Sequence, residues 1–332
     1  MTAAPPVTVA IPTIGRLDYL PEVRASLERQ RFADVEALIL DNESPPDARD
    51  FFADWARSDR RVRVVRVAPR ISMFANFDRG RLLGAGKYLA FFHDDDSYAP
   101  EFLEKHVELL DREPGVGFAG CNNDFIDEEG HILERRRWIR RTRAIAGRAY
   151  IRRLFRTGRN VVPMQGIVYR KAALRPEGFD DTMSCHFGDF VILMRMAETH
   201  DVGLVRDPVV RVRRHTRQTS ASMRLSEGLS LRVELMQKYC SEYRTRWPDD
   251  ATFLHSMQQD LARSVRIGAV WGWLTAVDDA EATACREALH GARLGRELSS
   301  AMRRAERLGL KSDVRRSLLA PFVRRLGNAL GV

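Results

Sequence analysis

The sequence predicts an α/β fold, in which a Rossmann-like, mostly parallel sheet carries helices on both faces and is followed by a C-terminal helical region. Strand and helix signals alternate over the first 100 residues, which is the order of a parallel sheet. After about residue 225 only helical spacing of apolar residues continues. The chain has 332 residues, 44% of them apolar, so it can bury two cores. We therefore expect domains at residues 1–225 and 226–332.

The elements of the first 100 residues are predicted from the spacing of their apolar side chains. β-branched and apolar runs predict strands, and apolar residues three or four apart predict helices. Pro45 suits the first turn of the second helix, and Gly84 is a normal stop for the third. The predicted strands cover residues 7–13, 35–41, 62–67 and 87–96, and the predicted helices cover residues 17–30, 45–59 and 72–83.

Beyond Pro100 the signals are less regular. They predict a helix at residues 101–110, a strand at 116–119, a hairpin turn at 127–130, a strand and short helix within 160–174, a helix from about Gly188 and two short strands within 202–215.

The composition excludes several classes of protein. The four cysteines are widely spaced, so neither a disulfide scaffold nor a zinc cluster is expected. The sequence has no apolar run of membrane-spanning length and no basic leader, so we expect a cytoplasmic protein. Residues 313–330 combine an apolar stripe with arginines outside it. This pattern predicts either peripheral contact with a membrane or packing against this chain or a homodimer partner.

The net charge is +9, and basic residues concentrate between Glu134 and Arg175. This segment, residues 134–175, contains thirteen arginines, one lysine and one glutamate. Its field attracts phosphate, acidic sugars, anionic lipid or nucleic acid, although a solvated arginine-rich face explains it equally well. No nucleic-acid-binding module is recognisable, so nucleic acid is not the expected partner. A nucleic-acid-binding protein that uses this basic segment is kept as an alternative.

Three consecutive aspartates, Asp94 to Asp96, follow the fourth predicted strand. Neighbouring carboxylates raise each other's pKa unless a cation neutralises them. Carboxylate oxygens suit Mg²⁺ and Mn²⁺, which leave coordination positions for substrate phosphates. A helix cap at Asp96 or Ser97 explains one such residue but not three. Because ligands bind beyond the carboxyl ends of parallel strands, the triplet and Asp41 predict a metal and diphosphate site.

Five sequence blocks in order resemble a known family. They are VTVAIPTIGR, LILDNESPPD, FANFDRGRLLGAGKYLAFFHDDDSYAP, GFDDTMSCHFGDFVILMRMA and RVRRHTRQTS, and they lie within residues 7–220. The chain resembles the family 2 glycosyltransferases of GT-A fold, of the bacterial surface-polysaccharide or glycoconjugate type. The resemblance implies inverting transfer of a sugar from a nucleoside-diphosphate sugar, assisted by Mn²⁺ or Mg²⁺, to a glycan, lipid-linked or natural-product acceptor.

The resemblance also implies roles for single residues. It places the nucleotide at Pro12, Thr13, Asp41, Asn76 and Asp94, and the metal at Asp95, Asp96 and His215. Asp189 in HFGDF matches the general base, for which a helix cap is the structural alternative. On the acceptor side the resemblance places Gln165, His186 and Gly188.

Two positions depart from the family pattern. His93 stands where the first aspartate is usual, and Gly188 stands where an acid is usual. These departures make a catalytically inactive scaffold the main alternative. Four arginines of the last block could clamp phosphates, namely Arg211, Arg213, Arg214 and Arg217. We further expect the arginines at 135–137 to favour an anionic acceptor.

Overall fold

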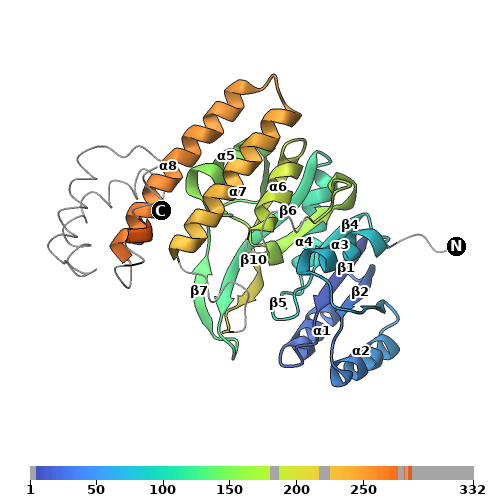
Figure 1. The fold of residues 1–332 in the computed structure, drawn as a ribbon. Helices are drawn as coiled ribbons and strands as arrows, with labels where there is room; N and C mark the ends of the chain where they lie inside the picture. Colours follow the sequence, from blue (N-terminus) through green and yellow to red (C-terminus); the bar gives the residue numbers. More distant parts are fainter. Residues whose placement is uncertain (1–4, 180–186, 217–224, 276–279, 281–282, 286–332) are drawn as a thin grey trace. The chain divides into compact units, whose positions relative to one another are not determined.

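The computed structural model describes residues 5–179, 187–216, 225–275, 280 and 283–285 (Figure 1). The chain divides into two compact units. The first contains Met1–Tyr150 and Asn160–Ala221, and the second contains Ile151–Arg159 and Ser222–Val332. Compared with a single boundary at residue 225, this division assigns Ile151–Arg159 to the second unit.

The first part of the sheet is parallel, as predicted. Strands β1, β2, β3 and β4 lie in the order β3-β2-β1-β4, and β1 pairs in parallel with both β2 and β4. In this register Thr13 lies beside Asp41, so the ends of β1 and β2 carry both residues at one edge of the sheet. The strands are β1 (Val7–Thr13), β2 (Val35–Asn42), β3 (Val62–Val67) and β4 (Tyr88–Phe91).

The second part of the sheet is mixed. Strand β9 (Ile167–Arg170) runs antiparallel between β4 and β6 (Val116–Ile126), and β6 is parallel to β10 (Asp201–Arg213). The remaining strands are antiparallel partners, β5 (Ser97–Tyr98) and β8 (Arg143–Ile145) of β10 and β7 (Ile132–Arg136) of β6. Residues 202–215 were expected to form two short strands. The structure instead has one long strand, whose register shifts between Val205 and Pro208, because Pro208 lacks the N–H that a regular ladder needs.

Helices cover both faces of the parallel part (Figure 1). On one face, helices α1, α2 and α4 bury apolar residues such as Leu27, Trp55 and Phe102 in one cluster with alternate strand residues such as Ile39. Helix α3 lies on the other face, where a Cβ on Gly80 would be 2.8 Å from that of Ala10. The helices are α1 (Leu20–Glu28), α2 (Pro46–Ser58), α3 (Met73–Leu83) and α4 (Phe102–Arg112).

The other elements of the first unit complete the sheet region. They are the start of α5 (Gly147–Thr157), the 3-10 turns η1 (Met164–Gly166) and η2 (Lys171–Ala173), and α6 (Gly188–Ala197). In the second unit, α7 (Leu225–Arg246) and α8 (Ala251–Thr275) are helical, as the sequence predicted. Within that unit Arg152 forms an ion pair with Asp260 at 2.8 Å. No helix among the described residues has both the length and the apolar character needed to span a membrane.

Candidate functional site

The turn that carries the aspartate triplet begins where β4 ends, at Phe91. The Tyr98 ring stacks on Phe92 with 3.8 Å between ring centroids. The Tyr98 hydroxyl donates to the carbonyl of Phe91 at 3.2 Å and accepts from the N–H of His93 at 2.9 Å. The strand predicted to reach Asp96 therefore stops five residues earlier, because Tyr98 closes the chain into a turn.

Asp94 is buried against β1. The Thr13 hydroxyl donates to its Oδ2 at 2.7 Å, and the Arg16 guanidinium lies 3.7 Å from its Oδ1. Burial raises the pKa of Asp94 to about 6, although Arg16 and Thr13 act in the opposite direction. The structure thus brings together two residues predicted to contact the nucleotide, Thr13 and Asp94.

One carboxylate oxygen of Asp95 contacts nitrogen atoms of two other side chains. Arg16 donates to its Oδ2 at 2.9 Å, and Nε2 of His215 lies 3.0 Å from the same oxygen. His215 is buried, with its ring 5.4 Å from that of Tyr19. The predicted pairing of Asp95 and His215 at one site therefore exists as a direct contact, although the two residues are far apart in the sequence.

Asp96 is 1% exposed and does not cap the following helix. Its Oδ1 accepts from the N–H of Arg213 at 2.8 Å, while its Oδ2 has no hydrogen-bond partner among the described residues. Burial and the neighbouring Asp95 raise the pKa of Asp96 well above its usual value. Helix α4 begins after Glu101 without a side-chain cap, which excludes capping by Asp96 or Ser97 as the reason for the triplet.

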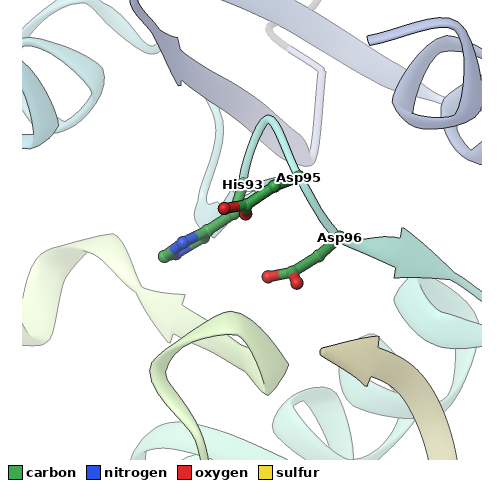
Figure 2. A group of neighbouring side chains, drawn as sticks. All are labelled: His93, Asp95 and Asp96. Atoms are coloured by element: carbon green, nitrogen blue, oxygen red, sulfur yellow. The ribbon is translucent and has the colours of Figure 1, made fainter. Parts of the chain in front are cut away.

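His93 lies at the same turn, and one ligand atom from each of His93, Asp95 and Asp96 is within 4.8 Å of the others (Figure 2). Its ring meets Phe77 edge-on at 5.4 Å. Burial lowers the pKa of His93 to about 4, so the imidazole is neutral at physiological pH. A neutral imidazole and two carboxylates fit a divalent cation, because a buried nitrogen of His93 and a buried oxygen of Asp96 have no hydrogen-bond partner in the described part of the chain.

Asp41 is 1% exposed at the end of β2. The N–H of Ser44 donates to its Oδ1 at 2.8 Å, and Arg66 donates to its Oδ2 at 2.7 Å. Burial raises its pKa, but the hydrogen bonds from Ser44 and the charge of Arg66 outweigh burial, and the net pKa of Asp41 is lowered. Asp41 is therefore held as a carboxylate, which can accept hydrogen bonds but not donate them.

Pro12 lies in β1 next to Leu40 of β2, one residue before Thr13. Asn76, in α3, is 3% exposed and bonded within the protein. Its Nδ2 donates to the carbonyl of Leu40 at 3.0 Å, and its Oδ1 accepts from Arg79 at 2.8 Å. Asn76 thus fastens α3 to the end of β2, and its contact with a nucleotide stays a prediction.

Asp189 lies in the first turn of α6, whose N-cap residue Phe187 makes no side-chain cap. Burial raises the pKa of Asp189 to about 6, opposed by Asn160 and by backbone N–H groups at the helix start. Nδ2 of Asn160 lies 3.5 Å from Oδ2 of Asp189. The Asn160 amide is oriented by two donors to its Oδ1, the Tyr150 hydroxyl at 2.9 Å and the N–H of Val162 at 3.1 Å. This arrangement holds the Asn160 NH₂ group towards Asp189.

Gly188 has a steric explanation. A Cβ at this position would lie 2.4 Å from the ring of Phe74 in α3, so an acidic side chain does not fit. The Phe74 ring is 6.2 Å from that of Phe77, which contacts His93. The start of α6 is therefore packed, through two rings of α3, against the turn that carries the aspartates.

The remaining predicted residues are only partly described. Gln165 is half-buried in the 3-10 turn η1, which precedes β9. The carbonyl of Gly166 in the same turn lies 3.1 Å from Nε2 of His106. His186, Arg217 and residues 313–330 lie outside the described residues.

The prediction that Arg213 and Arg214 clamp phosphates is not supported by their contacts. Arg213 is 2% exposed and donates to the carbonyls of Asp127 and Glu128 at 2.9 and 2.8 Å and to that of Asp95 at 3.0 Å. It therefore joins the β6–β7 turn to the aspartate turn. Arg214 forms an ion pair with Glu134 at 2.7 Å.

Sequence reasoning missed Arg16 and Asn160. Arg16 lies in the first of the five blocks, VTVAIPTIGR, and an arginine directly after a strand whose sheet edge also carries three aspartates is a usable signal. Asn160 gives no such signal, because it lies far from Asp189 along the chain and only the fold brings their side chains together.

The family model "Glycosyl transferase family 2" matches residues 8–176, about half of the chain. Among curated proteins, the chain is 25% identical over 130 residues to the GalNAc(5)-diNAcBac-PP-undecaprenol beta-1,3-glucosyltransferase of Campylobacter jejuni, covering 39% of this chain and 41% of that protein. The first matching relatives are covered over 14% to 46% of their own lengths, so the chain corresponds to less than half of each.

Two solved structures share the fold. S. aureus TarS 1-349 in complex with UDP-GlcNAc has a TM-score of 0.65 at 15% identity, covering 86% of this chain and 80% of that one. The mannosyltransferase PcManGT from Pyrobaculum calidifontis, in complex with GDP-Man and Mn²⁺, has a TM-score of 0.54 at 13% identity, covering 99% and 87%. These likenesses establish the predicted GT-A architecture.

Proposed function

Because this chain belongs to glycosyl transferase family 2, we propose that it transfers a sugar from a nucleoside-diphosphate sugar to an acceptor hydroxyl by a single, inverting displacement. The observation that supports this best is the buried turn after β4, where ligand atoms of His93, Asp95 and Asp96 lie within 4.8 Å of one another. The same edge of the sheet carries Thr13 and Asp41.

The donor nucleotide lies, in this proposal, at the ends of β1 and β2. Asp41 accepts a hydrogen bond from the base or ribose, and Arg66 and Ser44 hold its carboxylate in place. Thr13 fixes Asp94 beside it, and Pro12 shapes the strand end without a competing N–H. Asn76 supports this edge by holding the Leu40 carbonyl.

Asp95 and Asp96 hold Mn²⁺ or Mg²⁺ in this proposal. The resemblance also placed His215 at the metal; in this proposal His215 instead orients Asp95 through its 3.0 Å contact. When bound, the ion acts as a Lewis acid that stabilises charge on the departing diphosphate. Arg16 bridges Asp94 and Asp95 and reduces the repulsion between their carboxylates. A mannosyltransferase with a related fold is known in complex with Mn²⁺, which is consistent with such a site.

Asp189 is the proposed general base. With a pKa of about 6 it is ionised at neutral pH, yet basic enough to take the proton of an acceptor hydroxyl. Asn160 is a positioning residue, because its oriented NH₂ group faces Oδ2 of Asp189. Gly188 leaves room for Phe74, which packs the helix start in place.

The acceptor side is proposed from the sequence match and from one relative. Gln165 matches the family's acceptor wall, and His186 lies in the sequence just before the proposed base. The exposed Arg135 lies on β7, which pairs with β6. The Campylobacter relative is named for an undecaprenol-diphosphate acceptor, so we favour an anionic, lipid-linked glycan. A cytoplasmic location with peripheral membrane contact through residues 313–330, and a homodimer, stay predictions.

Thermal unfolding of the full chain tests this function. The protein is melted with a panel of uridine, thymidine and guanosine diphosphate sugars, with and without Mn²⁺, because a ligand that binds the native state raises Tm. One nucleotide is expected to raise Tm only with the ion, and Asp95→Ala is expected to lose the effect. Slow hydrolysis of that sugar nucleotide by the wild type, but not by Asp95→Ala, separates an enzyme from an inactive scaffold.

A further inference from the structure

Two buried polar atoms on the turn after β4 lack a hydrogen-bond partner among the described residues, Nε2 of His93 and Oδ2 of Asp96. Leaving a buried polar atom unpartnered is costly, and native proteins rarely tolerate it without a reason. Figure 2 shows the side chains of His93, Asp95 and Asp96 extending from the same side of the turn. A shared ligand would satisfy both atoms at once.

Packing alone does not explain His93. The ring lies edge-on to Phe77, so an apolar side chain of similar size would fill the same place without burying a nitrogen. The backbone N–H of His93 donates to the Tyr98 hydroxyl. This hydrogen bond fixes the backbone of the turn, so the His93 side chain extends from a rigid position. Rigid placement of this kind is what a metal ligand needs.

We propose that His93 supplies a nitrogen ligand to the divalent ion held by Asp95 and Asp96, and that this ligand makes the site select Mn²⁺ over Mg²⁺. The inference rests on the proposed function, which places the ion at this turn. Both ions favour oxygen ligands, but Mn²⁺ is a first-row transition ion and accepts an imidazole nitrogen beside them more readily than Mg²⁺ does. An aspartate at position 93 would give an all-oxygen set, so the histidine changes the class of ion that the site accepts.

His215 has a different part in this arrangement. Its Nε2 lies 3.0 Å from Oδ2 of Asp95, so it contacts a metal-binding oxygen. A group in that position orients the carboxylate from the second coordination shell. His93 and His215 therefore make separable predictions, because only one of them places nitrogen on the ion.

Pulsed electron paramagnetic resonance of Mn²⁺ bound to the full chain, in the presence of UDP or whichever nucleoside diphosphate raises Tm, detects a coordinated histidine nitrogen directly. We expect nitrogen modulation in the wild type and in His215→Gln, and its loss in His93→Asp. In competition titrations the wild type is expected to bind Mn²⁺ at least ~10-fold more tightly than Mg²⁺, and His93→Asp to reduce that ratio to about 3-fold or less.

The outcomes separate this inference from the function on which it rests. If Mn²⁺ does not bind at all, the proposed metal site itself is wrong. If Mn²⁺ binds without nitrogen modulation, or if the modulation persists in His93→Asp, the role of His93 is overturned while the site stands. If His93→Asp does not fold, the wild type and His215→Gln are labelled with ¹⁵N-histidine instead. A coordinated ¹⁵N-histidine signal that is retained in His215→Gln supports His93 as the ligand. Loss of that signal in His215→Gln overturns the proposal.

Discussion

The two carboxylate regions of the proposed site share a raised pKa but differ in what surrounds them. Burial raises the pKa of both Asp94 and Asp189 to about 6. Asp94 lies among other carboxylates and close to Arg16. Asp189, in contrast, contacts the neutral Asn160, and no cationic side chain in the described part of the chain pairs with it.

This difference indicates two uses for a buried carboxyl group. A cluster of acids with cationic neighbours lowers its energy when a divalent ion joins it, because the ion offsets their mutual repulsion. A single acid near tyrosines and an amide has no such option, and it lowers its energy by taking up a proton. The first region is therefore suited to binding a cation and the second to accepting a proton.

Replacing the proton-accepting group has the largest expected effect. Asp189→Asn keeps the shape of the side chain but cannot take a proton, so we expect activity to fall about 10²–10⁴-fold. Donor binding, measured as the Tm increase with nucleoside diphosphate and Mn²⁺, is expected to stay unchanged. Activity within a few-fold of wild type would show that Asp189 only supports the helix start.

Removing the Asn160 amide that faces Asp189 should change the pH dependence of kcat/KM. Asn160 lowers the pKa of Asp189, so in Asn160→Ala the acidic limb of kcat/KM, centred near pH 6 in the wild type, moves to higher pH. We expect about a 3–10-fold loss at pH 6 and little loss at pH 8, since the base is ionised there in both proteins. Tyr150→Phe, which removes one donor that orients Asn160, should shift the limb less. An equal loss at every pH would contradict this role.

Filling the space at Gly188 should destabilise the first unit. In Gly188→Ala the new Cβ would lie 2.4 Å from the buried Phe74 ring, so we expect a loss of about 1–3 kcal/mol in the free energy of unfolding. Urea denaturation measures this loss. The double variant Phe74→Leu with Gly188→Ala should show less than the sum of the two single effects, and strict additivity would argue against the contact.

An effect of similar size and opposite sign is a gain in stability in Asp189→Asn. The folded-state pKa of Asp189 is raised, so its ionisation costs stability as pH rises through about 6. Asp189→Asn should therefore be more stable than wild type at pH 8, by about 1–3 kcal/mol. The gain should shrink as pH falls from about 6 towards 4, because the wild-type carboxyl group becomes protonated in the folded state and then increasingly in the unfolded state. Thermal unfolding at pH 4 and pH 8 measures the difference. Equal differences at both pH values would exclude this cost of ionisation.

Much of the parallel half of the fold was predictable from local patterns. Residues 62–67 form a strand with the predicted bounds, because their apolar residues alternate as a strand requires. The aspartate triplet was recognisable because three adjacent acids behind an apolar strand conflict with packing. The antiparallel β9 was not predictable as such, because pairing direction depends on which strands flank it and no local pattern records them.

The sequence by itself determined the order of the elements, the carboxyl groups at their ends and the family to which the chain belongs, since periodicity and motif order are local properties. Only the tertiary structure decided which polar side chains meet, such as His215 and Arg16 on one oxygen of Asp95. It also showed that Arg213 joins two turns within the protein. Such contacts join residues that are remote in the chain, and their distances are set by strand order and register.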